Sequence, residues 1–212
     1  GLYAGRERVE DGGDTAITER VITRRGSERV ARVAFEQARR RRKHVTLVHK
    51  ANVLRATCGL FREAALSVAA QYPDVACDEL LVDAAAMRLI TTPERFDVLV
   101  TTNLFGDILS DEAAALVGGL GLAASANLGA QAAIFEPVHG SAPDIAGRGI
   151  ANPLAATGAA AMLAAHLGAG DVALTIERAI DATLRRGPLT PDLGGTANTA
   201  QVAEFLIQHM ER

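Results

Sequence analysis

Two aspartates four residues apart, Asp107 and Asp111, lie in the segment NLFGDILSD, directly after an apolar run. In a helix, this spacing places both carboxylates on one face of the first turns. Carboxylates this close repel each other unless a proton or a cation joins them, and Mg²⁺ or Mn²⁺ prefers such hard oxygen ligands. The competing interpretation is that the pair only decorates a helix N-terminus, where acidic residues are favoured.

A third carboxylate, Asp83, ends the segment ACDELLVD, which is typical of a strand. Ligands of open α/β sheets gather at the carboxyl ends of the strands. Because Asp107 and Asp111 also follow a predicted strand, we expect all three side chains at one edge of a sheet. The pattern therefore favours a divalent-metal site with these three aspartates as ligands.

Lys50 stands at the end of another predicted strand, in HKANVL. A lysine partly desolvated near a metal ion can lose its proton near neutral pH and act as a general base. A strand-end lysine can also simply extend its ammonium group into water. The residues alone leave both interpretations open.

The longest polar motif is FEPVHGSAPDIAG, followed by GIANP. Its prolines and glycines predict a rigid surface loop, and such loops commonly hold a ligand. The backbone N–H groups of Gly140, Ser141 and Ala142 could bind a phosphate, whereas a plain Ω-loop is the structural alternative. The chain has no GxGxxG or GxxxxGK[ST] segment, so neither usual nucleotide fingerprint is present.

Hydrophobic periodicity predicts alternating strands and helices, which indicates an α/β fold with a mainly parallel sheet covered by helices. Residues 1–25 are expected to form a hairpin or arm with extended islands at 15–18 and 21–23, and 121–133 a loop. Ser27 is the expected N-cap of the first helix. The predicted strands are 44–49, 76–83, 97–102 and 133–136, and the predicted helices are 27–42, 57–72, 84–90, 105–117, 153–166, 172–186 and 199–210.

Composition narrows the classes of partner. The chain of 212 residues carries 22 basic and 25 acidic side chains, and its aromatic content is only 4%, which argues against nucleic-acid binding. The five cations at 39–43 are either an anion patch or a solvated helix C-terminus. No apolar run approaches the ~18 residues of a membrane span, and no signal peptide is recognisable.

The cysteines indicate the cellular compartment, and the first residues bear on whether the chain is a complete protein. Cys58 and Cys77 form no CxxC motif, so we expect reduced thiols in a cytoplasmic protein. The chain begins Gly1-Leu2-Tyr3 without a methionine, and we therefore expect a fragment or a processed piece.

In its ordered motifs the chain resembles the β-decarboxylating dehydrogenases of the isocitrate/isopropylmalate dehydrogenase family. These motifs are GLYAG, HKANVL, VDAAAM, NLFGDILSD, GGLGL, HGSAPDIAG, NP and PDLGG. The resemblance implies an isopropylmalate dehydrogenase-like fold with a small β arm for dimerisation. It divides the chain into part of the dimerisation domain (1–43), a central region with base and metal carboxylates (44–140), and an adenosine-binding loop with C-terminal helices (141–212).

The resemblance also implies an activity, which is NAD-dependent and Mg²⁺- or Mn²⁺-dependent oxidative decarboxylation of a 2-hydroxy di- or tricarboxylate. Tyr3 would be the acid that protonates the enol product, Lys50 the base, and Asn52 a neighbour of substrate and nicotinamide. Asp83, Asp107 and Asp111 would bind the metal. The adenosine site would comprise His139, Gly140, Ser141, Ala142, Pro143, Asp144, Ile145 and Asn152.

Two further expectations come from the family. Lys50 and Asp83 would belong to one subunit of a homodimer, or dimer-based oligomer, and Asp107 and Asp111 to the other. Asp144 and Ile145 stand where NADP-using relatives carry a cation and a tyrosine, which predicts NAD as the cofactor.

The substrate stays open between isocitrate or homoisocitrate, which we favour, and 3-isopropylmalate, tartrate or D-malate. A non-catalytic regulatory subunit of a heteromeric isocitrate dehydrogenase is a second alternative, and a metal phosphohydrolase a third that gives Lys50 and the loop no role. Family members place further residues before the GLY segment, including the arginines that bind substrate carboxylates. We therefore expect the 212 residues alone to be catalytically incomplete.

Overall fold

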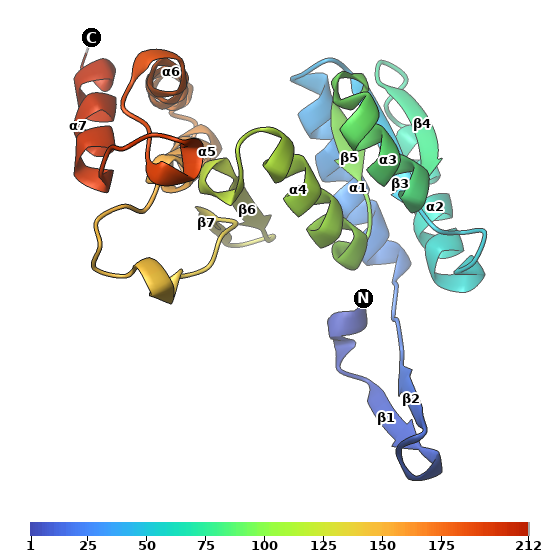
Figure 1. The fold of residues 1–212 in the computed structure, drawn as a ribbon. Helices are drawn as coiled ribbons and strands as arrows, with labels where there is room; N and C mark the ends of the chain where they lie inside the picture. Colours follow the sequence, from blue (N-terminus) through green and yellow to red (C-terminus); the bar gives the residue numbers. More distant parts are fainter. Residues whose placement is uncertain (212) are drawn as a thin grey trace. The chain divides into compact units, whose positions relative to one another are not determined.

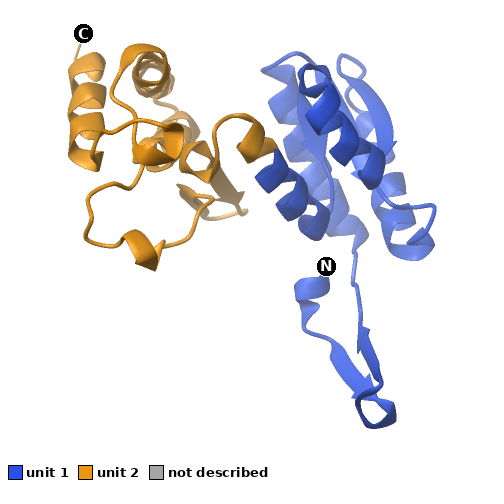
Figure 2. Ribbon diagram, viewed as in Figure 1, with its two compact units in different colours: residues 1–112 blue, residues 113–212 orange. Residues whose placement is uncertain are grey.

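The computed structural model describes residues 1–211 and divides the chain into two compact units, residues 1–112 and 113–212 (Figure 2). Each unit has a hydrophobic core of its own. The division falls inside the central region 44–140, and the three-part division that follows the motifs stays a prediction.

The centre of unit 1 is a parallel sheet of three strands (Figure 1). Strand β3 (His44–His49) lies between β4 (Ala76–Leu81) and β5 (Val98–Val100), with Leu47 opposite both Glu79 and Val100. Residues 45–49 of β3 are buried, as expected of a parallel strand covered on both faces. The sheet therefore brings three strand ends to one edge.

Helices cover both faces of this sheet. Helices α1 (Arg24–Arg39) and α2 (Arg55–Ala69) enclose one core with the β3 side chains Val45 and Leu47. Helices α3 (Val82–Thr91) and α4 (Asn103–Leu116) meet Val48 on the other face. The buried positions of α1 are 27, 31, 34, 35 and 38, a stripe at helical spacing.

The predicted arm is a hairpin of β1 (Glu7–Glu10) and β2 (Thr15–Thr18), preceded by the turn η1 (Leu2–Ala4) and closed by η2 (Asp11–Gly13). In Figure 1 it projects away from the sheet of unit 1. Neither strand has a buried residue, and Val9 is 68% exposed. An isolated two-stranded hairpin is marginally stable in water, and the core residues of unit 1 include none from this hairpin.

Unit 2 contains an antiparallel pair, β6 (Ala124–Leu128) and β7 (Ala133–Pro137), and three helices. The helices are α5 (Leu154–His166), α6 (Gly170–Arg186) and α7 (Thr199–Met210). Their core includes Leu154, Ala179, Val202 and Leu206. Single turns of 3₁₀ helix, η3 (Pro93–Arg95) in unit 1 and η4 (Leu120–Leu122), η5 (Pro143–Ile145) and η6 (Pro191–Leu193) in unit 2, complete the described elements.

The structure corrects two local predictions near the N-terminus. Residues 21–23 belong to neither strand of the hairpin, and Ile22 packs on the first core of unit 1. The N-cap of α1 is Thr23, whose side chain accepts from the Gly26 N–H, and not Ser27. Ser27 lies buried in the first turn and donates to the Thr23 carbonyl.

Two further predictions need correction. Asp83 lies in the first turn of α3, because the strand β4 ends at Leu81. The segment 121–133, expected to be a loop, contains β6, whose sequence ASANL lacks a strong apolar alternation. Among residues 1–211, no helix is long and apolar enough to cross a membrane.

The cations at 39–43 are neither a free anion patch nor simply solvated. Arg39 pairs with Asp74 at 2.7 Å, and Arg41 with Asp97 at 2.9 Å. The Asp97 side chain is only 2% exposed and also accepts from the backbone N–H groups of Arg42 and His44. Asp97 thus ties the turn after α1 to the start of β5.

We predict that Asp97→Asn lowers the free energy of unfolding by about 2 kcal/mol at neutral pH, because it removes a buried carboxylate that accepts several hydrogen bonds. Burial raises the pKa of Asp97, but the hydrogen bonds from Arg41 and the backbone outweigh it, and the pKa is lowered. The contribution of Asp97 to the free energy of unfolding is therefore complete above the unfolded-state pKa of about 3.9. It is lost as the pH falls through the lower pKa of the folded state.

Urea unfolding of wild type and Asp97→Asn from pH 7 to acid measures this difference. The control is Asp181→Asn, which breaks the exposed pair with Arg185 and should change stability little. If the difference in unfolding free energy between wild type and Asp97→Asn does not shrink in acid, the role of the Asp97 carboxylate in stability is contradicted.

Candidate active site

Lys50 and Asp83 form the first part of the site. Lys50 follows β3, Asp83 begins α3 after β4, and the register of the two strands pairs His49 with Leu81. The Lys50 Nζ donates to the Asp83 Oδ1 at 2.5 Å. This hydrogen bond holds the pKa of Asp83 below its usual range. Asn52 lies exposed in the turn after Lys50.

Tyr3 and Asp107 form the second part. The Tyr3 hydroxyl donates to the Asp107 Oδ2 at 3.1 Å, and the Asn103 amide donates to the Oδ1 at 3.4 Å. The hydrogen bond to Asp107 and the charge of that carboxylate raise the pKa of Tyr3. Asp111 lies one helical turn further along α4 and is exposed, like Asp107.

The predicted metal ligands do not gather within one chain. Among residues 1–211, no group of three His, Cys, Asp or Glu side chains could hold a metal ion. Asp83 instead contacts Lys50, and Asp107 contacts Tyr3. The predicted residues thus form two half-sites in the chain, Lys50 with Asp83 and Tyr3 with Asp107.

Both half-sites lie beside exposed apolar side chains. On α3, Met87 and Ile90 follow Asp83 at helical spacing and are 58% and 63% exposed. On α4, Leu104 and Ile108 are exposed as well, while Leu109 is buried. The outer faces of both helices therefore carry carboxylates and apolar groups together.

The polar loop of unit 2 surrounds a hollow of about 980 Å³. Of the predicted adenosine-site residues, six line it, whereas Pro143 and Asp144 are exposed at η5 outside the lining. Ala142 has φ +44°, an uncommon conformation for a residue with a side chain. The lining residues are Gly121, His139, Gly140, Ser141, Ala142, Ile145, Ala146, Gly147, Gly149, Ile150, Ala151, Asn152, Pro191, Asp192 and Thr199.

Hydrogen bonds orient the polar groups of this hollow. The Asn152 Nδ2 donates to the Asp192 Oδ2 at 2.9 Å, and its Oδ1 accepts from the Leu154 N–H at 3.0 Å. The second amide hydrogen of Asn152 stays available for a ligand acceptor. His139 places its Nδ1 2.9 Å from the Gly140 carbonyl, which makes Nδ1 the donor and leaves Nε2 as an acceptor.

Sequence reasoning gave no role to Asp192 or Gly121, which also line this hollow. A Cβ on Gly121 would lie 2.6 Å from the Asp192 Oδ2, so only glycine leaves room for the bond between Asp192 and Asn152. The one signal for Asp192 was its place in PDLGG, a motif used for the resemblance alone.

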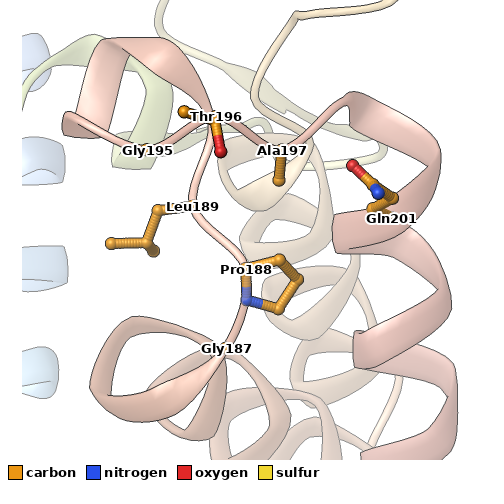
Figure 3. Close-up of a pocket in the computed structure, with 7 residues that line it drawn as sticks. All are labelled: Gly187, Pro188, Leu189, Gly195, Thr196, Ala197 and Gln201. Carbon is orange, nitrogen blue, oxygen red and sulfur yellow. The ribbon is translucent and has the colours of Figure 1, made fainter.

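Another hollow of unit 2, of about 590 Å³, offers less chemistry (Figure 3). Its lining has no ionisable side chain, and the Gln201 amide is already engaged in the capping box of α7. The residues that line it are Gly187, Pro188, Leu189, Gly195, Thr196, Ala197 and Gln201.

Comparisons with known proteins agree on one family. The family described as isocitrate/isopropylmalate dehydrogenase matches residues 1–206. A homoisocitrate dehydrogenase of Methanocaldococcus jannaschii is 54% identical over the whole chain, which covers 60% of that protein. An isocitrate/homoisocitrate dehydrogenase of Thermus thermophilus is 52% identical, also over the whole chain and over 63% of its own length.

Solved structures show the same similarity. The crystal structure of isocitrate dehydrogenase from Methylococcus capsulatus matches with a TM-score of 0.93 and 52% identity. The match covers 100% of this chain and 65% of that one. The chain therefore spans a little under two thirds of the length of these proteins.

The second half-site makes a prediction about Tyr3. Because the Asp107 carboxylate both accepts from the phenol and repels its phenolate, Asp107→Asn should lower the pKa of Tyr3 toward its ordinary value. Subtracting the ultraviolet titration of a Tyr3→Phe variant isolates the signal of Tyr3. Asp111→Asn is the matched control, since Tyr3 donates to Asp107. An unchanged titration midpoint in Asp107→Asn would refute the contact.

Proposed function

The chain belongs to the isocitrate/isopropylmalate dehydrogenase family, and from that premise we propose that its protein is an NAD-dependent, Mg²⁺-dependent enzyme. The proposed reaction oxidises and decarboxylates a 2-hydroxy acid with a β-carboxylate. The observation that carries the proposal is the pair of half-sites, in which Lys50 contacts Asp83 and Tyr3 contacts Asp107. Together they hold one basic group, one weak acid and carboxylate oxygens.

The carboxylates fit a hard divalent cation, because all three offer charged oxygen ligands. We propose that Asp83 of one copy joins Asp107 and Asp111 of another to complete the ligand set. A bound Mg²⁺ would supply charge stabilisation for the substrate hydroxyl oxygen and for the enolate left by decarboxylation, and NAD would accept the hydride.

Lys50 is the proposed base. Its Nζ would take the proton of the substrate hydroxyl as C2 is oxidised. In the free chain this nitrogen donates a hydrogen bond to Asp83. With Asp83 engaged as a metal ligand, Lys50 would be free to turn toward the substrate. Asn52, exposed two residues later, would contact substrate and nicotinamide.

Tyr3 is the proposed acid. The ordinary pKa of a tyrosine is about 10, and Asp107 raises the pKa of Tyr3, so the phenol is protonated at neutral pH. It can therefore deliver a proton to the carbon that loses CO₂. Contact with Asp107 places this proton beside the proposed metal carboxylates.

We propose a homodimer, and the two half-sites support it. The apolar outer faces of α3 and α4 carry the carboxylates, and burying them against a second copy would bring the two half-sites together while covering Met87, Ile90 and Ile108. The arm would provide a further contact with the partner. We propose no nucleic-acid or membrane partner for this dimer.

NAD is the proposed cofactor, with its adenosine in the hollow of unit 2. Asn152 and His139 offer a donor and an acceptor there. Asp144, exposed beside the hollow, would repel the 2′-phosphate of NADP, and screened repulsion of this kind suffices for about tenfold discrimination. Ile145, in its lining, offers no compensating cation.

Isocitrate or homoisocitrate is the proposed substrate, and 3-isopropylmalate or tartrate the alternative. Relatives named for homoisocitrate, isocitrate and 3-isopropylmalate are all 50–55% identical, so identity does not choose between them. A regulatory subunit is disfavoured because Lys50, Tyr3 and the aspartates are all kept. Both cysteines are free, which fits the proposed cytoplasmic location.

The test is turnover of the full-length protein with Mg²⁺ and each hydroxy acid. We expect NADH and CO₂ to form together, and kcat/KM for NAD to exceed that for NADP about tenfold or more. Lys50→Met should abolish both products, because it keeps the length of the side chain without its amine. Near-wild-type rates in Lys50→Met, or equal use of NADP, would contradict the respective assignment.

A further inference from the structure

His49 is buried next to Lys50, and both of its ring nitrogens are engaged. It is the last residue of β3 and only 7% exposed. The Ala51 N–H donates to the Nδ1 at 3.2 Å, and the Nε2 lies 3.2 Å from the Glu79 Oε2. The ring thus joins the turn after β3 to the neighbouring strand β4.

These contacts specify the tautomer of His49. Because a backbone N–H can only donate, Nδ1 must accept with its lone pair. The proton of the neutral ring therefore sits on Nε2 and is donated to Glu79. A histidine that merely fills a core would not need this particular arrangement.

Glu79 is itself held in place from α2. The Arg62 guanidinium donates to both of its carboxylate oxygens, at 2.5 and 2.8 Å. The Arg62 hydrogen bond lowers the pKa of Glu79 against the opposing effect of burial, and His49 contributes in the same direction. Glu79 is thus a fixed, charged acceptor for the His49 ring.

The turn that His49 braces is the one that carries Lys50. The Lys50 carbonyl accepts from the N–H groups of Val53 and Leu54, which closes the turn on one side. The Ala51 N–H donates to the His49 ring on the other side of Lys50 in the sequence. The backbone on both sides of Lys50 is therefore held, and its side chain is aimed at Asp83.

We propose that His49 is a positioning residue for Lys50, acting through the Ala51 N–H and anchored by Glu79 and Arg62. This inference rests on the proposed function of Lys50 as the base. Proton transfer needs its donor and acceptor within hydrogen-bond reach, and a misplacement of about 1 Å can cost on the order of a hundredfold in rate.

The test compares His49→Ala with His49→Asn in the full-length enzyme. The Asn Oδ1 can replace Nδ1 as acceptor for the Ala51 N–H, although the shorter side chain does not reach Glu79. His49→Ala should lower kcat about tenfold with little change in KM, since His49 is buried and its ring nitrogens face Ala51 and Glu79. His49→Asn should recover most of kcat. Melting temperatures of the two variants separate this effect from loss of folded protein.

Two kinetic outcomes would overturn the proposal. One is wild-type kcat in His49→Ala. The other is equal loss in both variants, in proportion to their melting temperatures, which would leave His49 with a packing role alone.

Absence of turnover in the wild type would instead overturn the proposed function. A crystal structure of His49→Ala then decides the positioning role by itself. A displaced Lys50 that has lost its bond to Asp83 supports the role, and an unchanged turn with the 2.5 Å contact intact rejects it.

Discussion

Two carboxylates of the candidate site, Asp83 and Asp107, have a positive or proton-donating partner in the same chain, and these two contacts define the geometry of the half-sites. Within one chain, Asp83 is neutralised by the Lys50 ammonium and Asp107 accepts from Tyr3. These partners come from the turn after β3 and from the segment before the arm, far from the aspartates in sequence. The site therefore depends on the parallel sheet that brings its strand ends to one edge.

The same two contacts explain how the carboxylates of the site can lie apart in a single chain. A cluster of three carboxylates without a cation would be strained by mutual repulsion. Division between two helices with exposed apolar faces avoids this cost, and in the proposed dimer a second copy would cover those faces. The proposed dimer would therefore couple assembly to metal binding, because each half-site alone lacks ligands that the other carries. The arm, which buries none of its own side chains, would gain burial in the proposed dimer.

Much of the architecture was predictable from the sequence because burial follows periodicity. Strand β3 and helix α7 have the predicted bounds, since HVTLVH is continuously apolar apart from a threonine and its ends, and α7 begins with a capping box at Asn198. Strand β6 was missed because small and polar residues in ASANL pair through backbone atoms. The contacts of Tyr3 with Asp107, and of His49 with Ala51 and Glu79, were not predictable, because side-chain partners depend on register and local geometry that no motif encodes.

Complementation between two inactive variants tests the shared site most directly. Full-length Lys50→Met and Asp107→Asn, each damaged in a different half-site, are combined and their mixed dimers isolated by two affinity tags. In a mixed dimer one site carries both changes and the other carries neither, so each variant alone should be nearly inactive while the mixed dimer regains about half of wild-type turnover per dimer. Mixed dimers that assemble but stay as inactive as the parents would contradict the account.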